Sequence, residues 1–456
     1  MKKTNLKQSI KDTISKYSNN YIEIRIEETQ TNTLRYTGKK LDEIHKNNSI
    51  GGCIRALSKH GWGFSSFNNL DNLQSKTAEA INMAKTIKGK SIVYLPNEKF
   101  SDIVKLNVKK DPRNISIVQK KTLLDEYIDC IWEHTAITSS NLRYTDMHKY
   151  KIFANSEGSY IEQERIDVTL GASVIAKKDE DVQQATISIG SLGDFSIVEN
   201  LHSEMKGLCN KAISFLTAPK IKPGEYSVIL DPILAGVFVH EAFGHLSEAD
   251  HVYENEQLKE IMQLGKQFGP NDLNIVDGAS IPNLRGSYKY DDEGVLSTKT
   301  YLMQNGILSG RLHSRETAGN MNENLTGNAR AINTNFPPIV RMTNTYIEPS
   351  KYTFEELLNG IDEGIYAKNW YGGMTSMEQF TFSAGEAYMI KNGKIDNLIR
   401  PVMLSGNLFS TLKNISGIGN DIDMNQGGGC GKGGQIPLPV SNGSPHILID
   451  KCLISG

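Results

Sequence analysis

The stretch YSVILDPILAGVFVHEAFGHLSEAD, residues 226–250, decides how the C-terminal half of this chain folds. Residues 226–230 form a short apolar run that predicts a strand. Asp231 is a preferred helix N-cap, and Pro232 suits the first helical turn because its missing N–H is not needed there. The helix that follows is apolar on every face as far as Val239. We therefore expect this helix to be buried.

Three polar side chains interrupt this apolar helix: His240, Glu241 and His245. Each needs a partner when it leaves water. A bound cation supplies one, whereas the simpler alternative is that each histidine donates to a nearby carbonyl. Two histidines and a glutamate in this order favour the metal.

The spacing HExxxH is one residue longer than the HExxH of familiar zinc peptidases. Residues four apart lie about 40° around a regular helix, whereas residues five apart lie about 140° around it. The two histidines would then diverge. A single π-type turn, or a loosening of the helix at Gly244, brings them back to one side. We predict such an irregularity between Glu241 and His245.

A catalytic zinc usually takes three protein ligands, so a third must come from elsewhere. We favour Cys430, in NQGGGCGKGGQIPLPV (residues 425–440), because glycines let the backbone deliver a thiolate into a crowded pocket. A flexible glycine-rich loop with an incidental cysteine is the alternative. The other candidate ligands are Glu248, His251, His313 and His446.

The same glycine-rich stretch does not match a phosphate-binding loop. A Walker A motif needs glycine six residues before its lysine and Ser or Thr after it. Relative to Lys432, these positions hold Gln426 and Gly433. Nucleotide binding is excluded on this pattern.

If the metal is bound, Glu241 follows His240 directly and is placed to accept a proton from an activated water molecule. It could then return that proton to a departing amine, so that one residue serves both halves of hydrolysis. Peptide-bond cleavage is the natural reaction, with Glu241 as the catalytic base. Hydrolysis of an amidated small molecule stays open.

Length and pattern predict an α+β protein in three parts. With 456 residues, the chain exceeds what one core usually supports. We expect two smaller α+β units, over residues 1–110 and 111–220, and a C-terminal metallopeptidase domain over residues 221–456. Asn305-Gly306 and Asn392-Gly393 indicate tight hairpins, so the last part should be rich in antiparallel sheet around its buried metal-binding helix.

Composition narrows partners and location. The formal net charge of -2 gives no overall positive field for nucleic acid or an anionic membrane, and no apolar run approaches a membrane span. The five cysteines are scattered and odd in number, so disulfides are not expected. We predict a cytoplasmic protein that binds neither nucleic acid nor membrane.

The sequence resembles the TldD/PmbA family, and within it the metal-bearing TldD type. The motifs that carry the resemblance run in the family's order over nearly the whole chain: GWGFSSFNNL, VILDPILAGVFVHEAFGH, GSYKYDDEG, TGNAR, RMTNTYIEP, FTFSAGEAYMI and CGKGGQ. HEAFGH followed by a late CGKGGQ is the specific combination. Carried over by motif, the metal ligands are His240, His245 and Cys430, and the catalytic residue is Glu241.

The resemblance implies a zinc peptidase with one zinc ion per catalytic chain, acting on peptides or unfolded segments in an enclosed site. It also implies a dimer, with a second copy or with a PmbA/TldE-type sibling that lacks HExxxH. An older association of the family with gyrase modulation suggests the alternative, a non-catalytic interaction protein whose metal site is structural.

Two details of the resembling motifs stay open. Family loops often read CGKDGQ, whereas this chain has Gly433 in place of the acidic residue, so another group must do any orienting that this residue does in relatives. Arg341 and Asn344, in RMTNTY, are candidate binders of a peptide backbone. Ordinary hydrogen bonding inside a strand is the competing interpretation.

Overall fold

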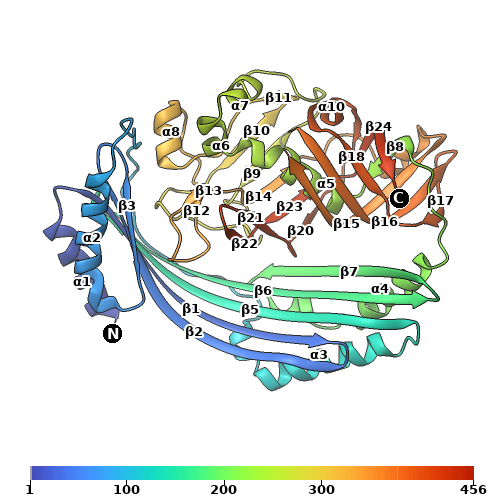
Figure 1. The fold of residues 1–456 in the computed structure, drawn as a ribbon, viewed down its shortest axis with the longest axis horizontal. Coiled ribbons are helices and arrows are strands. Elements are labelled where there is room, and N and C mark those ends of the chain that lie inside the picture. The colour runs from blue at the N-terminus through green and yellow to red at the C-terminus, as the bar shows by residue number, and fades with distance from the viewer. Residues whose placement is uncertain (1–2, 377) are drawn as a thin grey trace.

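The computed structural model describes residues 3–376 and 378–456, and its first seven strands lie in one long curved sheet (Figure 1). The strands of this 7-stranded sheet are β1 (Tyr21–Thr37), β2 (Lys40–Leu57), β3 (Trp62–Phe67), β4 (Ser101–Val104), β5 (Ile137–Asn155), β6 (Tyr160–Lys178) and β7 (Asp181–Leu192). β1 pairs antiparallel with both β2 and β5. The two predicted N-terminal units therefore share one sheet.

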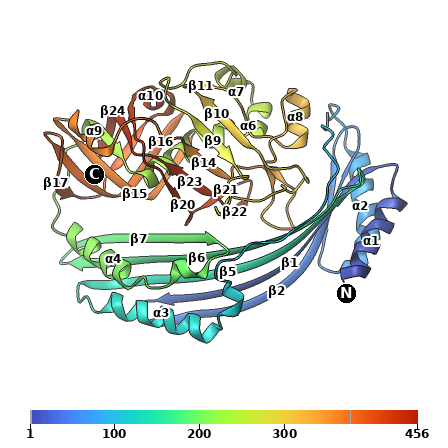
Figure 2. The ribbon, with the colours of Figure 1, turned by 180° about the vertical axis from the view of Figure 1, so that it is seen from behind.

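Helices cover the outer face of this sheet at two places (Figure 2). The apolar stripe of α1 and the alanine-rich face of α2 pack on one end, whereas α3 and α4 pack on the other. The even-numbered residues of β1, such as Ile24 and Leu34, enter these cores because side chains alternate along a strand. The helices here are α1 (Lys3–Lys16), η1 (Leu70–Asn72), α2 (Leu73–Thr86), η2 (Pro112–Asn114), α3 (Ile117–Trp132), η3 (Phe195–Val198) and α4 (His202–Phe215).

The C-terminal part contains two further large sheets. One joins β8 (Gly224–Leu230), β15 (Glu363–Ser376), β16 (Gln379–Lys391), β17 (Lys394–Ile399), β18 (Met403–Asn407), β19 (Ile415–Ile418) and β24 (Ile447–Ser455), and the pairing of β15 with β16 closes it into a ring. The other joins β9 (Ile275–Gly278), β10 (Lys299–Gln304), β11 (Ile307–Leu308), β14 (Asn344–Ile347), β20 (Asp423–Asn425) and β23 (Ser441–Ser444). The predicted α+β class, with an antiparallel C-terminal part, is confirmed.

Two ribbons and several short helices complete this part. The ribbons pair β12 (Ala329–Arg330) with β13 (Ile339–Val340), and β21 (Gly429–Lys432) with β22 (Gln435–Pro439). The helices are α5 (Pro232–Val239), η4 (His240–Gly244), η5 (His245–Ser247), α6 (Ala249–Glu254), α7 (Glu256–Ile261), α8 (Arg315–Met321), α9 (Phe354–Asn359) and α10 (Leu408–Lys413). α5 contacts β8 and β15 of one sheet and β14, β20 and β23 of the other, which explains its apolar surface.

Local sequence signals are realised in this part. Asn305-Gly306 joins β10 to β11 and Asn392-Gly393 joins β16 to β17, each with positive φ at both residues, as predicted. All five cysteines are free and buried. None of the helices in the described residues is long and apolar enough to cross a membrane.

The C-terminal part lies against the inner, concave face of the long sheet (Figures 1 and 2). Ion pairs join them: Arg55 with Glu293 at 3.0 Å, which is buried, Lys151 with Asp292 at 2.6 Å, and Arg315 with Glu157 at 2.7 Å. Between the two surfaces is a cavity of about 1100 Å³.

Candidate metal centre

The helix that carries the two histidines begins as its sequence predicts. The Asp231 carboxylate accepts the N–H of Leu234 at 2.8 Å, and Pro232 occupies the first turn of α5. After Val239 the α-helix ends. A π-helical turn, η4, follows over His240–Gly244 and leads into the 3-10 turn η5, which starts at His245.

The π turn is the irregularity predicted between Glu241 and His245. The N–H of His245 bonds the carbonyl of His240, a five-residue step that returns both side chains to the same side. Gly244 permits this path, because a Cβ there would lie 2.1 Å from Sδ of Met342. The extra residue of HExxxH is thus taken up by the backbone.

The structure brings His240, His245 and Cys430 together. One donor atom from each lies within 4.8 Å of the other two, and Sγ of Cys430 is 3.4 Å from Nε2 of His245. Nδ1 of His240 is buried and has no hydrogen-bond partner in the described part of the chain. Two imidazoles and a thiol that converge in this way fit the donor set of a zinc site.

The Cys430 sulfur is held in an environment that favours its thiolate. Burial raises the pKa of a thiol, but the neighbouring imidazoles of His240 and His245 outweigh burial and lower the pKa of Cys430 to about 5. Burial would lower the pKa values of both histidines, but Cys430 raises that of His240, and Glu248, followed by Cys430, raises that of His245. The thiolate is the form of cysteine that binds a metal ion, together with the neutral form of each imidazole.

Glu248 supports His245 from behind. Its fully buried carboxylate accepts Nδ1 of His245 at 3.0 Å and lies 3.0 Å from Nζ of Lys432. Burial would raise the pKa of Glu248, but His245 and Lys432 lower it to about 2. Glu248 was a candidate ligand in the sequence. Its carboxylate instead fixes the orientation of the His245 ring, which presents Nε2 to Cys430.

The remaining candidate ligands lie elsewhere. His313 contacts Thr317 and Glu323, and His446 contacts Asp421 and Tyr366. His251 groups with Glu248 and Asp250, but Nζ of Lys432 already lies 2.6 Å from Oδ1 of Asp250. A cation is less favoured beside that ammonium.

Glu241 lies at the accessible edge of the constellation. Its carboxylate is 3.9 Å from Nε2 of His245, and its side chain is 31% exposed, whereas that of Glu248 is fully buried. It is therefore the carboxylate that a reactant can reach.

Cys430 is carried by what we call the thiolate arm, residues 426–439, which includes β21 and β22. Arg341 donates to the carbonyls of Cys430 at 2.8 Å and Gln435 at 3.2 Å. Arg285 donates to the carbonyls of Gln426 at 2.6 Å and Gly428 at 2.8 Å. These guanidinium groups hold a glycine-rich backbone that would otherwise have many conformations.

The arm is also attached to the long sheet. Ser188 of β7 donates to the carbonyl of Gly427 at 2.9 Å, and Asp167 of β6 accepts Nε of Arg285 at 3.3 Å. A Cβ at Gly427 would lie 2.3 Å from the carbonyl oxygen of Ser188, so this glycine is needed for the approach. Neither Arg285 nor Asp167 was singled out from the sequence, where Arg285 merely precedes GSYKYDDEG.

Arg341 and Asn344, the candidate peptide binders, are both fully buried. Arg341 holds the thiolate arm, as described. Asn344 accepts the N–H of Gly286 at 3.0 Å and donates to the carbonyl of Gly278 at 2.7 Å. Asn344 also donates to the Ser287 hydroxyl at 3.0 Å, so the hydrogen bonds of both side chains go to other groups of the protein.

Family comparisons agree with this arrangement over the whole chain. Residues 22–84, 110–216 and 223–456 match the models for the first, central and C-terminal domains of PmbA/TldA metallopeptidases. The chain belongs to the PmbA/TldD family. The HExxxH histidines and Cys430 all fall in the C-terminal domain of this family.

Several PmbA/TldD relatives are named as metalloproteases. One from Synechocystis is 42% identical over 99% of this chain and 98% of its own length. One from Methanocaldococcus jannaschii is 37% identical over 93% and 94%. A protein of Saccharolobus solfataricus named as a zinc metalloprotease TldD homolog is 32% identical over 94% of each chain.

Solved structures of PmbA/TldD-like fold are also similar. A Thermotoga maritima protein, described as a candidate modulator of DNA gyrase, superposes with a TM-score of 0.81 at 23% identity, over 98% of this chain and 100% of its own. TldE from Thermococcus kodakarensis superposes with a TM-score of 0.77 at 15% identity, over 98% and 100%. At such identities the likeness concerns the fold alone.

Proposed function

We propose that this chain is a zinc-dependent peptidase in which His240, His245 and Cys430 hold one zinc ion and Glu241 is the catalytic base. The convergence of two imidazoles and a thiol from distant parts of the chain is the observation that carries the proposal. The names of the relatives, one of them a zinc metalloprotease, support it. Thiolate and imidazole ligands favour zinc over manganese or magnesium.

The residues around the centre have distinct roles in the proposed reaction. A zinc ion, when bound, lowers the pKa of a water molecule toward about 7 and polarises a peptide carbonyl. Glu241 takes the proton of the attacking water and gives it to the departing amine. Glu248 and Lys432 keep His245 in one orientation, and Arg341 keeps Cys430 in place.

The thiolate arm offers an edge for an extended peptide. β21 and β22 form a two-stranded ribbon, so each has an outer edge. Pro437 and Pro439 leave the edge of β22 without donors, whereas Gly429 and Gly431, exposed on either side of Cys430, leave that of β21 unobstructed. We propose that peptides or unfolded segments pair with β21, since folded proteins cannot present such a strand.

The proposed setting is a dimer in the cytoplasm whose active site is enclosed between the concave sheet and the C-terminal part. The partner is either a second copy or a TldE-type chain, as the likeness to TldE suggests. Five free, buried cysteines agree with a reducing compartment.

Metal analysis and one substitution test the proposal together. Protein purified without chelator should contain one zinc per chain. Glu241→Gln should retain that zinc and lose about 10²- to 10⁴-fold in kcat on an unstructured peptide, because the base is gone. The exposed Glu256→Gln is the matched control and should cleave like the parent.

Two outcomes would reject this function. Absence of stoichiometric metal would favour a non-catalytic interaction protein of the gyrase-modulator kind. Full activity of Glu241→Gln would remove the assigned base, even in zinc-loaded protein.

A further inference from the structure

The cavity between the long sheet and the C-terminal part borders the thiolate arm. Its lining includes residues 427–429, which directly precede Cys430, and residues 437–439 of β22, the strand that pairs with β21. The three metal-centre side chains are not among the described residues that line it. At about 1100 Å³ it lies just above the range of about 300–1,000 Å³ for small-ligand sites, so it has room for several residues of a peptide.

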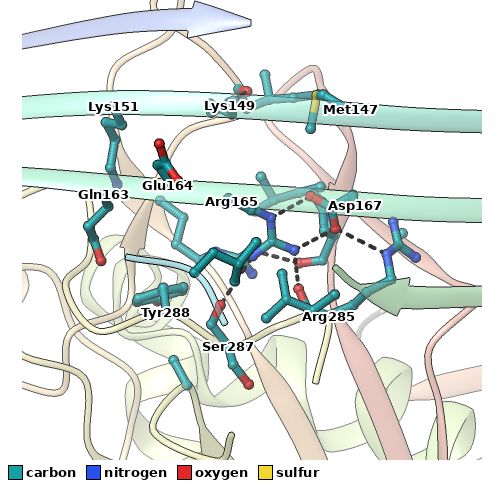
Figure 3. A pocket seen from close by; sticks show the side chains of 18 of the residues that line it. Met147, Lys149, Lys151, Gln163, Glu164, Arg165, Asp167, Arg285, Ser287 and Tyr288 are labelled. Carbon is teal, nitrogen blue, oxygen red and sulfur yellow. Dashed lines mark hydrogen bonds and ion pairs between the residues drawn. The ribbon is translucent and has the colours of Figure 1, made fainter. Parts of the chain in front are cut away.

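The sheet side of the cavity carries many polar side chains beside apolar ones such as Met147, Leu170 and Leu192. Threonine hydroxyls and charged side chains come from the odd-numbered positions of three adjacent strands, which face the C-terminal part. Of these, Lys149, Lys151, Arg165 and Asp167 are labelled in Figure 3. The contributing residues are Thr29 and Thr31 of β1, Arg143, Thr145, Lys149 and Lys151 of β5, and Arg165, Asp167 and Thr169 of β6. Such a surface solvates charge and offers hydrogen bonds.

Several carboxylates on this surface lie beside cations, whereas Glu164, which also lines the cavity, forms no ion pair within the described residues. Glu27 lies 3.1 Å from Lys149, and Asp292 lies 2.6 Å from Lys151. Asp167 is shared by two arginines, Arg165 and Arg285, whose contacts are drawn in Figure 3. The carboxylate Asp167 therefore balances only one of its two cations.

Other cations of the lining have no acidic partner at all. Arg143 and Lys105 are exposed, and neither forms an ion pair or hydrogen bond within the described residues. Arg143 lies opposite Arg35 of β1, an arrangement of like charges that costs stability, although Glu43 of β2 flanks Arg35 on its other side.

Arg330 adds a third cation that lacks a carboxylate partner. It is buried, and its guanidinium group donates to the carbonyls of Met342 and Pro439. Fixed positive charge inside a concave, partly desolvated space focuses its field on whatever enters. The cavity is therefore suited to an anionic ligand.

We propose that this cavity binds an acidic segment of the substrate peptide, next to the point where the chain would pair with β21. The inference rests on the proposed peptidase function and adds a preference for aspartate- or glutamate-bearing peptides. The hydroxyl-rich floor suits carboxylates and backbone amides, and the position beside the thiolate arm suits a chain that continues toward the metal centre. Peptides whose acidic side chains are replaced by amides should bind less well.

Binding of two fluorescein-labelled, unstructured peptides to zinc-loaded Glu241→Gln protein tests the inference. The peptides differ only in Asp and Glu against Asn and Gln. We expect the acidic peptide to bind about five- to tenfold more tightly at low salt, with the difference shrinking at 0.5 M NaCl because salt screens exposed charge. Fluorescence anisotropy measures both affinities.

Single substitutions locate the effect. Arg143→Gln and, separately, Lys105→Gln should each reduce the preference by about two- to fivefold, the range expected for one exposed ion pair. Arg113→Gln is the control, because Arg113 is an exposed arginine that already pairs with Asp111 and does not line the cavity. Thermal melting checks that each variant folds. Arg143 and Lys105 lie on different segments of the chain, so one local structural defect would not affect both variants.

Three results would overturn the inference. The first is equal binding of the two peptides, and the second is an unchanged preference for the acidic peptide in both cavity variants. The third is that a single-stranded oligonucleotide of equal charge binds more tightly than the acidic peptide and displaces it. A failure of the proposed peptidase function would be seen in a different measurement. If Glu241→Gln still cleaves the peptide, the base assignment is lost while the measured preference stands.

Discussion

The two halves of the metal centre are built in opposite ways. The helical half, from Asp231 to Glu248, is held by its own N-cap, its π turn and one carboxylate three residues beyond His245. The thiolate arm contains only the short ribbon of β21 and β22 and is held by side chains from 89 to 239 residues away. Local sequence therefore determines one half, and the packing of the whole chain determines the other.

Removing the sulfur should have the largest effect on the metal. Cys430→Ala deletes a proposed ligand, and loss of a group that merely orients a ligand already costs about 10- to 100-fold in affinity, so we expect a loss above about 100-fold. Competition with a chromophoric chelator measures it. Cys209→Ala, which removes a buried thiol elsewhere, is the control. Parental affinity in Cys430→Ala would assign the third ligand to Glu248 or another group.

The next effect concerns the support of the helical half. Glu248→Gln keeps an acceptor for His245 but leaves the buried Lys432 ammonium with a weaker partner. We expect about 10- to 100-fold weaker zinc binding and a lower melting temperature. Isothermal titration and thermal melting check this. An unchanged zinc affinity would mean that the π turn alone orients His245.

A smaller effect is expected at the attachment of the thiolate arm. Arg285→Lys keeps the charge, but one ammonium cannot bridge Gln426, Gly428 and Asp167 as the planar guanidinium does. Zinc release to a chelator should become about tenfold faster, at the low end of losses from groups that orient ligands.

Arg400→Lys is the matched control for that variant. Arg400 also joins the long sheet to the C-terminal part, through Asp181 and the carbonyl of Ala218, without touching the thiolate arm. If both lysine variants released zinc at the same rate, contact between the two parts of the molecule would matter and Arg285 itself would not.

The smallest effect on the metal is expected at the start of the helical half. Burial raises the pKa of Asp231 to about 6. The N–H groups of Leu234 and Asn369 donate to its carboxylate and would lower the pKa, but burial outweighs them. The folded state therefore binds this proton more tightly than the unfolded state. The associated stability is present below about pH 4 and is lost as pH rises through about 6.

Asp231→Asn keeps the N-cap acceptor and cannot ionise. Relative to the parent, its free energy of unfolding should rise by about 2–3 kcal/mol between pH 4 and pH 7, while its zinc affinity stays unchanged. Urea unfolding across this pH range checks it, with the exposed Asp423→Asn as control. A constant difference would show that Asp231 titrates normally.

Most features that depend on neighbouring residues, such as helix starts and hairpin turns, can be predicted from the sequence. Asp231 and Pro232 mark the start of the helix, and the five-residue step from His240 to His245 predicts an irregularity, which the structure contains as a π turn. The two Asn-Gly pairs mark hairpins because few other dipeptides accept positive φ at both positions. These features depend on neighbours in the chain, which the sequence displays directly.

What depends on distant packing was not predictable in the same way. Asp167 and Arg285 are 118 residues apart, and nothing in either segment indicates that they meet beneath the thiolate arm. Arg341 and Asn344 have the residue types of peptide binders, but their burial depends on how β14 and the loops around it pack. The shared sheet was likewise hidden, because strand pairing between β1 and β5 leaves no mark on either strand alone.

The order of the donor residues along the chain has a consequence for biosynthesis. Ribosomes make His240 and His245 long before Cys430, which follows His245 by 185 residues. The carbonyl anchors of the thiolate arm also need β6 and β7 already folded and docked. If Cys430 is the third ligand, as proposed, a nascent chain cannot assemble the metal centre before its folding is nearly finished. The proposed peptidase activity would then begin only when the chain no longer offers its own unfolded segments to cut.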